Sequence, residues 1–160
     1  MPGKMKTSGF TLVELMIVIV LLAILATIAA PSFRDMIERN RLQGQADELK
    51  SFLLYARGEA VTLRTTITVT TDDEDAWIIE RGNNTLRQLE HNPDQATIRS
   101  SAETITFRGN GTATATTFTV CHDDDPSRGY FLEIQASGAT SLYLQGEKDA
   151  NHTALDSCTL

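Results

Sequence analysis

Positively charged side chains are scarce in this sequence. The 160 residues include 14 lysines and arginines against 21 aspartates and glutamates, which gives a formal net charge of −7. Neutralising phosphates requires clustered lysine and arginine. This balance therefore argues against a nucleic-acid-binding protein and against electrostatic attraction to anionic lipid. The densest basic group is Arg34, Arg39 and Arg41, and the other basic residues are scattered.

Cysteine is also rare, and the usual catalytic patterns are missing. The two cysteines, Cys121 and Cys158, lack the Cys-x-x-Cys spacing of redox pairs and thiolate metal sites. The three histidines lie far apart, and no nucleophile elbow, phosphate-binding glycine loop or Cys-His dyad occurs. We therefore expect no enzyme activity, no cofactor, no small-molecule substrate and no metal site. A surface loop explains the His-Asp-Asp-Asp cluster at 122–125, although cation binding by the acidic loops stays open.

What the sequence does contain is one long apolar run. Between residues 10 and 30 the only polar side chains are Thr11, Glu14 and Thr27. About 21 residues at 1.5 Å each give a helix roughly 31 Å long, enough to span a bilayer core. The preceding segment carries two lysines and no acidic residue, a bias that keeps it cytoplasmic and sends the rest across. A carboxylate in such a run costs about 2.5 to 3.5 kcal/mol, so Glu14 needs a partner and is a functional candidate.

The start of the apolar run carries a recognisable junction. A short basic leader ends in Gly9-Phe10-Thr11-Leu12-Val13-Glu14, which continues directly into the apolar segment. This pattern resembles the class III signal of type IV pilins and pseudopilins. The resemblance implies that a prepilin peptidase cuts after Gly9 and methylates the new amino terminus at Phe10. It also implies that Glu14 pairs with the amino group of Phe10 on a neighbouring subunit. Cleavage would remove both leader lysines and change the formal net charge from −7 to −9.

Two other interpretations of the apolar run stay open. A secretory signal would need small residues before a cut beyond the run. The best candidate, residues 27–29, is poor because a cut after Ala30 would place Pro31 beside the scissile bond. A plain single-pass anchor fits the length but explains neither Glu14 nor the Gly9–Phe10 junction. We favour the pilin-type interpretation, which predicts a single-pass protein of the bacterial inner membrane with a periplasmic C-terminal domain.

The next segment, residues 31–64, is predicted to continue the helix as an amphipathic half. Pro31 and Gly44 are expected to bend the helix rather than end it, because the helical pattern persists beyond them. Small or apolar side chains recur every three or four residues on one face, which should pack on a globular domain. They are Leu42, Ala46, Leu49, Leu53, Ala56, Ala60 and Leu63.

Beyond residue 65 the sequence predicts β-structure. Residues 66–71 and 76–80 should form a hairpin, with the acidic run 72–75 at its tip. Signals are weak between 81 and 101, where we expect irregular structure with one short strand. Clearer strands are predicted at 103–108, 115–121, 130–136 and 140–144.

A helix followed by strands predicts an α+β fold, with a long N-terminal helix packed on an antiparallel β-sheet domain. Four segments are expected along the chain. They are a leader (1–9), a transmembrane and filament-core helix half (10–30), an amphipathic helix half (31–64) and a β-rich periplasmic domain (65–160).

Export also bears on the two cysteines. In an oxidising compartment an even pair is first interpreted as a disulfide, here between Cys121 and Cys158. Closing a loop of about 38 residues would stabilise the fold by roughly 4 kcal/mol on the chain-entropy model. The bond would also hold the C-terminus against the sheet.

The resemblance extends more weakly over the remaining chain. Residues 38–42, 46–49, 56–60, 105–111 and 118–121, with Trp77, look like the FimU and FimT minor pilins and the H-type pseudopilin of type II secretion. This implies a FimU-like minor pilin that helps to initiate pilus assembly in the tip complex. The implied partners are other minor and major pilins, the prepilin peptidase and the inner-membrane assembly platform.

Two alternatives are an H-type minor pseudopilin and a FimT-like DNA receptor for natural transformation. The FimT-type receptors carry a Gly-Arg-x-Arg motif, and the matching place here is Gly138-Ala139-Thr140-Ser141. The missing arginines and the acidic charge make nucleic acid an unlikely partner.

Overall fold

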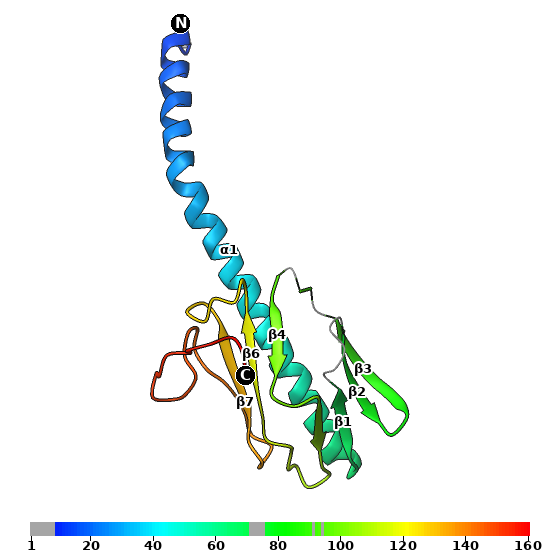
Figure 1. Cartoon of the computed structure of the whole chain (residues 1–160). Helices are drawn as coiled ribbons and strands as arrows, with labels where there is room; N and C mark the ends of the chain where they lie inside the picture. The colour runs from blue at the N-terminus through cyan, green and yellow to red at the C-terminus, as the bar shows by residue number, and fades with distance from the viewer. Residues whose placement is uncertain (1–8, 71–75, 91, 94) are drawn as a thin grey trace, which may run out of the picture. The chain divides into compact units, whose positions relative to one another are not determined.

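The computed structural model describes residues 9–70, 76–90, 92–93 and 95–160 (Figure 1). The chain divides into two compact units, the N-terminal unit Met1–Glu38 and the C-terminal unit Arg39–Leu160. The helix α1 (Leu12–Leu63) belongs to both units. The leader before Gly9, the expected acidic hairpin tip at 72–75 and His91 lie outside the described residues.

Both ends of α1 have clear local causes. At its start the Thr11 hydroxyl oxygen accepts the backbone N–H of Glu14 at 3.2 Å, the bond expected of a helix N-cap. At its end Arg64 adopts a left-handed conformation (φ 50°), and the N–H of Thr65 donates to the carbonyl of Ala60 at 3.1 Å. The helix continues through residue 31, and the bend expected at Pro31 stays a prediction.

The second half of α1 buries one face against the sheets, as predicted. Six of the seven predicted positions are buried, from Leu42 to Ala60. Leu63 is the exception, with 42% of its surface exposed, because the helix ends there and the chain turns away at Arg64. Phe52, which the sequence pattern did not include, is fully buried and lies among the largest core side chains.

Eight strands are present in the described part of the chain, and all named pairings are antiparallel. The strands are β1 (Ile67–Thr70), β2 (Ala76–Arg81), β3 (Asn84–Glu90), β4 (Thr97–Ser100), β5 (Thr104–Phe107), β6 (Thr116–Cys121), β7 (Tyr130–Ile134) and β8 (Thr140–Leu142). They form two four-stranded sheets, in the orders β3-β2-β1-β5 and β4-β6-β7-β8. The predicted α+β fold, a long N-terminal helix packed on an antiparallel β-sheet domain, is confirmed, and the domain consists of two sheets.

The predicted β1–β2 hairpin is confirmed, with Val69 opposite Ile79. The irregular segment expected at 81–101 is wrong, because β3 and β4 lie there. β3 returns along β2 after a turn at Gly82, which has the positive φ (61°) that glycine adopts readily, and β4 pairs with β6. Leu89 is the only buried residue of β3, so this edge strand is stabilised by its pairing with β2 and gave no hydrophobic signal.

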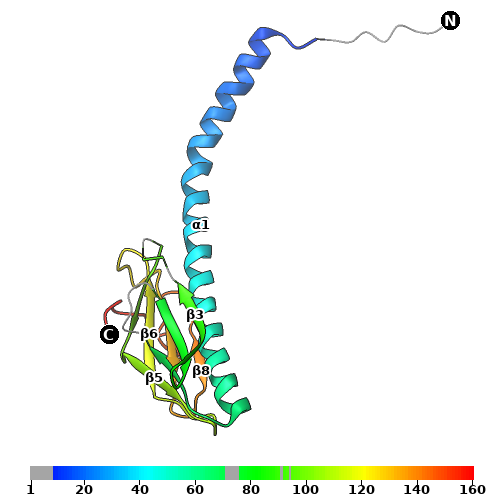
Figure 2. The same cartoon turned by 90° about the vertical axis from the view of Figure 1, so that its right-hand side faces the viewer.

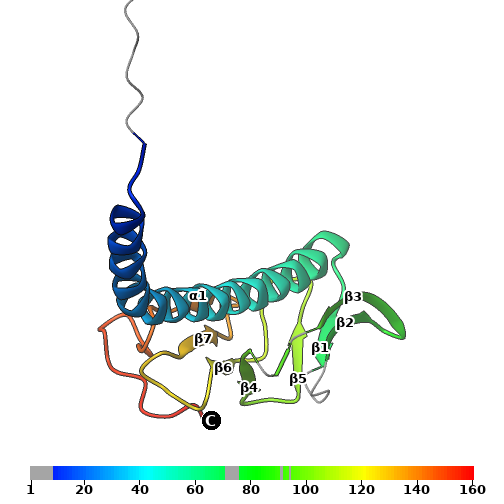
Figure 3. The same cartoon turned by 90° about the horizontal axis from the view of Figure 1, so that it is seen from above.

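The two sheets share one core with the second half of α1. Figure 2 and Figure 3 show this part of the helix lying along one side of both sheets. The inner faces contribute fully buried side chains such as Val69 and Phe107 from one sheet, and Phe118 and Leu132 from the other. The rings of Trp77 in β2 and Phe118 lie 5.5 Å apart and join the sheets.

Candidate functional site

The predicted processing junction lies just before α1. Gly9 and Phe10 precede the first helical residue and are exposed, with 73% of the Phe10 surface accessible. A Cβ built on Gly9 would meet nothing within 4 Å. Nothing in the described structure therefore requires glycine at this position.

Glu14 lies in the first turn of α1 and is exposed. Thr11 and Glu14 have the Ser/Thr-x-x-Glu spacing of a capping box, and a carboxylate in the first turn is also favoured by the helix dipole. The sequence interpretation overlooked Thr11, although this spacing ahead of an apolar run was a visible signal. Among the described residues no ion pair involves Glu14.

The apolar half of α1 behind this junction is exposed along its length. Its best 18-residue window has a mean hydropathy of 2.9 and is not buried against any part of the protein. By length and composition α1 is able to cross a membrane. Thr27, one of the two polar residues in this half, satisfies its hydroxyl locally by donating to the carbonyl of Ile24 at 2.7 Å.

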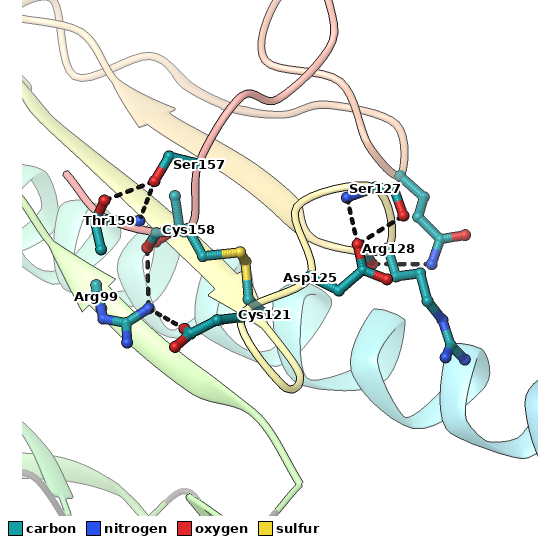
Figure 4. The surroundings of a disulfide bond; sticks show 11 residues. Arg99, Cys121, Asp125, Ser127, Arg128, Ser157, Cys158 and Thr159 are labelled. Carbon is teal, nitrogen blue, oxygen red and sulfur yellow. Dashed lines mark hydrogen bonds and ion pairs between the residues drawn. A yellow bond between two sulfur atoms is a disulfide. The ribbon is translucent and has the colours of Figure 1, made fainter.

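The two cysteines form the disulfide that the sequence predicted. Cys121, the last residue of β6, bonds to Cys158 in the C-terminal tail, with their Cα atoms 6.2 Å apart (Figure 4). Both residues are buried. A Cβ on Gly129 would lie 2.7 Å from the Cys121 sulfur, so the bond needs glycine beside it.

Hydrogen bonds hold the same tail against the outer face of the second sheet. The hydroxyl of Thr119 donates to the carbonyl of Cys158 at 2.7 Å. Arg99 donates to the same carbonyl at 3.1 Å and to the carboxylate of Asp124 at 2.7 Å. The hydrogen bond and the positive charge of Arg99 lower the pKa of Asp124 below its ordinary value of 3.8.

The acidic cluster after Cys121 is occupied by protein contacts. His122 lies 3.2 Å from the carboxylate of Asp123, Asp124 is bound by Arg99, and Asp125 accepts the backbone N–H and the hydroxyl of Ser127. Within the described ranges no three metal-ligating side chains come together.

An arginine that the sequence interpretation did not single out connects α1 to both sheets. Arg57 donates from Nε to the carbonyl of Gly111 at 3.1 Å and from Nη2 to that of Ser137 at 3.3 Å. A Cβ on Gly138 (φ 79°) would lie 2.0 Å from the Gly111 oxygen, so only glycine fits there. The place compared above with the DNA-receptor motif is thus a tight turn held by Arg57.

A long helix with an exposed apolar first half, and a second half packed on antiparallel sheets, is the architecture of the type IV pilin-like proteins. Residues 45–138 match the family model described as type II transport protein GspH, and residues 4–30 match the prokaryotic N-terminal methylation motif. The chain belongs to this family, that of minor pilins and pseudopilins of the GspH and FimU type.

Solved structures of this architecture agree with that assignment. A crystal structure of the type IV minor pilin FimU from Pseudomonas aeruginosa is 31% identical over 76% of this chain and 97% of its own, with a TM-score of 0.63. The minor pseudopilin EpsH from the type 2 secretion system of Vibrio cholerae is 15% identical over 67% of this chain and 99% of its own, with a TM-score of 0.57. At that identity the EpsH likeness shows the fold alone. No curated protein sequence matches the chain.

Proposed function

We propose that the chain is a FimU-like minor type IV pilin that helps to initiate pilus assembly in the tip complex. Prepilin peptidase cuts it after Gly9 and methylates Phe10, and the domain that follows α1's apolar half faces the periplasm. The observation that carries the proposal is the junction 9–14, which lies in the matched methylation motif and opens an exposed apolar helix. A processing junction followed by an exposed apolar helix is not expected in a soluble enzyme.

The proposed assembly contact follows from the position of Glu14. A carboxylate one turn inside an apolar helix is costly unless a cation approaches it. After cleavage the methylated amine of Phe10 is a cation located at the same end of the helix. In a bundle of such helices, the Phe10 amine of one subunit pairs with Glu14 of its neighbour and offsets that cost.

The choice of FimU over an H-type pseudopilin is supported by sequence identity, 31% against 15%. The pseudopilin alternative is favoured by the family match itself and by a TM-score of similar size. Deleting the gene separates the two functions. We expect a loss of surface pili with normal secretion of exoproteins, whereas the reverse result would establish the pseudopilin role.

The assembly contact is tested with two substitutions at Glu14. Glu14→Gln keeps a side chain suited to the N3 position of a capping box but removes the charge, and Glu14→Ala removes both. We expect both variants to insert in the membrane, to be cleaved after Gly9 and to be absent from sheared fibres. The readouts are the mass of the mature N-terminus and immunoblots of the membrane and fibre fractions.

Thr27→Ala is the matched control, because it also removes a polar side chain from the apolar half of α1. It should enter fibres normally. Normal incorporation of Glu14→Gln, with only Glu14→Ala impaired, would show that Glu14 acts through its helix cap and would overturn the pairing.

A further inference from the structure

The C-terminal unit is acidic overall, but one of its ends carries arginines. The loops 64–66, 108–112 and 135–139 meet there. Arg57 binds carbonyls in two of them, and a Cβ on Gly109 would lie 2.6 Å from the backbone of Arg64. The end of β2 lies at the same end, because Glu80 pairs with Thr68, but Glu80 and Arg81 offset each other. The remaining charged residues are Arg57, Arg64 and Arg108, with Glu59 in the last turns of α1, and these loops contain no acidic residue. We call this group of arginines the arginine end.

The loops 122–129 and 143–157 lie at the opposite end of the second sheet (Figure 1). The N–H of Gly146 donates to the carbonyl of Gly129 at 2.8 Å, which joins the two loops. We call them the acidic end. They contain six acidic residues against Arg128 and Lys148. The acidic residues are Asp123, Asp124, Asp125, Glu147, Asp149 and Asp156. The adjacent part of α1 leaves this balance unchanged, because Arg39 and Arg41 are matched by Asp47 and Glu48.

Ion pairs within the chain do not neutralise all the charged side chains of the arginine end and the acidic end. At the acidic end Asp124 is paired with Arg99, Asp156 with Lys148 and Glu147 with His152. The Asp123 side chain is 86% exposed and its contact is to His122. At the other end Arg64 and Arg108 are exposed, and neither has an ion pair in the described part of the chain. Both ends therefore present charge to solvent.

Each end also presents apolar surface beside its charges. Leu144, at the start of the second acidic loop, is 65% exposed. Next to the arginine end, a shallow groove of about 400 Å³ runs along α1 and is lined by Leu54, Arg57, Gly58, Val61 and Thr62. Complementary charge gives orientation more than affinity, so a specific contact also needs apolar area of this kind.

We propose that the arginine end of one copy of this chain docks on the acidic end of a second copy. Because the two surfaces differ and lie at opposite ends of one unit, the contact is head-to-tail and does not close into a symmetric dimer. The contact does not rest on the proposed function. It should weaken with salt, because the charges are exposed.

A second copy fits the arginine end better than nucleic acid does. Three arginines beside Glu59 make a small positive surface within a protein of net charge −7. A duplex carries a phosphate about every 1.7 Å of its axis and needs many basic contacts, whereas one acidic end supplies a compact group of carboxylates.

The test uses purified full-length protein in detergent, with photoreactive p-benzoylphenylalanine in place of Ala139, which is exposed in the 135–139 turn. Equal amounts of isotope-labelled and unlabelled protein are mixed and irradiated at low salt, and crosslinked peptides are identified by mass spectrometry. We expect crosslinks from residue 139 to loop 122–129 or 143–157 of the other copy. Their yield should fall about fivefold or more at about 0.5 M salt.

The double variant Arg64→Asp/Arg108→Glu, carrying the same probe, should lower the yield as strongly. The control Arg34→Glu/Arg41→Glu changes the net charge equally but lies in exposed turns of α1 outside the arginine end, and it should not lower the yield. If the first variant does not fold, the salt dependence of the unmodified surface tests the same contact. Crosslinks only between two 135–139 turns, no crosslinks between copies, a yield insensitive to charge and salt, or crosslinks to added DNA alone would each overturn the proposal. None of these readouts requires cleavage or fibre assembly, so they are independent of the Glu14 test.

Discussion

The side chain of Glu14 is suited to two roles, one as part of a helix cap and one as a charged partner in assembly. Its position three residues after Thr11 suits a helix cap, and its carboxylate is exposed with no ion pair in the described structure. The cap explains an acidic or amide side chain at this place but does not require a charge. Comparing glutamine with alanine at residue 14 therefore separates helix initiation from charge pairing.

Asp124 shows how a single residue makes stability depend on pH. Its pKa is lowered in the folded protein by the hydrogen bond and charge of Arg99. A carboxyl group with a depressed folded pKa stabilises the fold above its unfolded pKa, and this contribution is lost as the pH falls through the folded value. Asp124→Asn should therefore be less stable than the unmodified protein near neutral pH, and the difference should disappear on acidification.

The measurement is denaturant unfolding of both proteins at about pH 7 and about pH 3. Asparagine tolerates the left-handed conformation (φ 55°) of residue 124, so the backbone is not strained by the change. A difference in stability that stays the same at both pH values would show that the effect is not due to titration.

At the scale of elements, predictability followed the hydrophobic pattern. The positions 42–60 of α1 and the strands β5 and β7 alternate buried and more accessible residues, and β6 is almost wholly buried. β8 is half-buried throughout and was recognised from the Ser137-Gly138 turn before it. Each of these elements was recognised from the sequence within a few residues. β3 and β4 have almost no buried side chains, since Leu89 is the only buried one, so pairing with β2 and β6 creates these strands. Tertiary pairing of this kind leaves no local signal.

The candidate sites divide in the same way. Gly9, Phe10 and Glu14 are consecutive enough for a short motif to reveal them, and the cysteine pair followed from its even number and the expected compartment. Arg57 was missed because its partners, Gly111 and Ser137, are 54 and 80 residues away and are backbone carbonyls, which any sequence supplies.

Removing Arg57 should loosen the junction between α1 and the two turns it binds. Arg57→Ala is expected to lower the free energy of unfolding by about 2 kcal/mol, because two carbonyls lose a charged donor. Arg57→Lys should recover little of this loss, since one ammonium group does not reproduce the planar fork. The exposed control Arg108→Ala should change stability by less than about 0.5 kcal/mol. Denaturant unfolding measures all three, and equal values for Arg57→Lys and the unmodified protein would contradict the two-carbonyl role.

The C-terminal tail depends on the disulfide in a comparable way. The bond joins residues separated by 37 positions, so Cys121→Ala/Cys158→Ala should cost about 4 kcal/mol on the chain-entropy model. Limited proteolysis should then cut the tail first, because only the bonds from Thr119 and Arg99 to the Cys158 carbonyl would hold it. A loss of less than about 1 kcal/mol, with an uncut tail, would show that these bonds suffice.

At the scale of the whole molecule, the separation of charge matters more than its sum. The net charge of −7 opposes binding to polyanions, while the arginine end alone is locally positive. Protein families with one fold acquire different partners by changing a few such surface residues. In this chain the turn 135–139 lies at the arginine end, next to Arg57, and is the place where added arginines would have most effect.

This arrangement gives the final prediction, which concerns DNA. The unmodified full-length protein should not retard duplex DNA in a gel, even at low salt, because its few arginines neutralise too few phosphates. Ala139→Arg/Ser141→Arg creates the Gly-Arg-x-Arg pattern after Gly138 and adds two positive charges beside Arg57, Arg64 and Arg108, so this variant should retard DNA in a salt-dependent manner.

Placing the same two arginines at the exposed acidic-end residues Ala150 and Asn151 is the matched control and should have no effect. Retardation by the unmodified protein would revive the DNA-receptor alternative, and equal retardation by both variants would show that net charge, not the arginine end, decides binding.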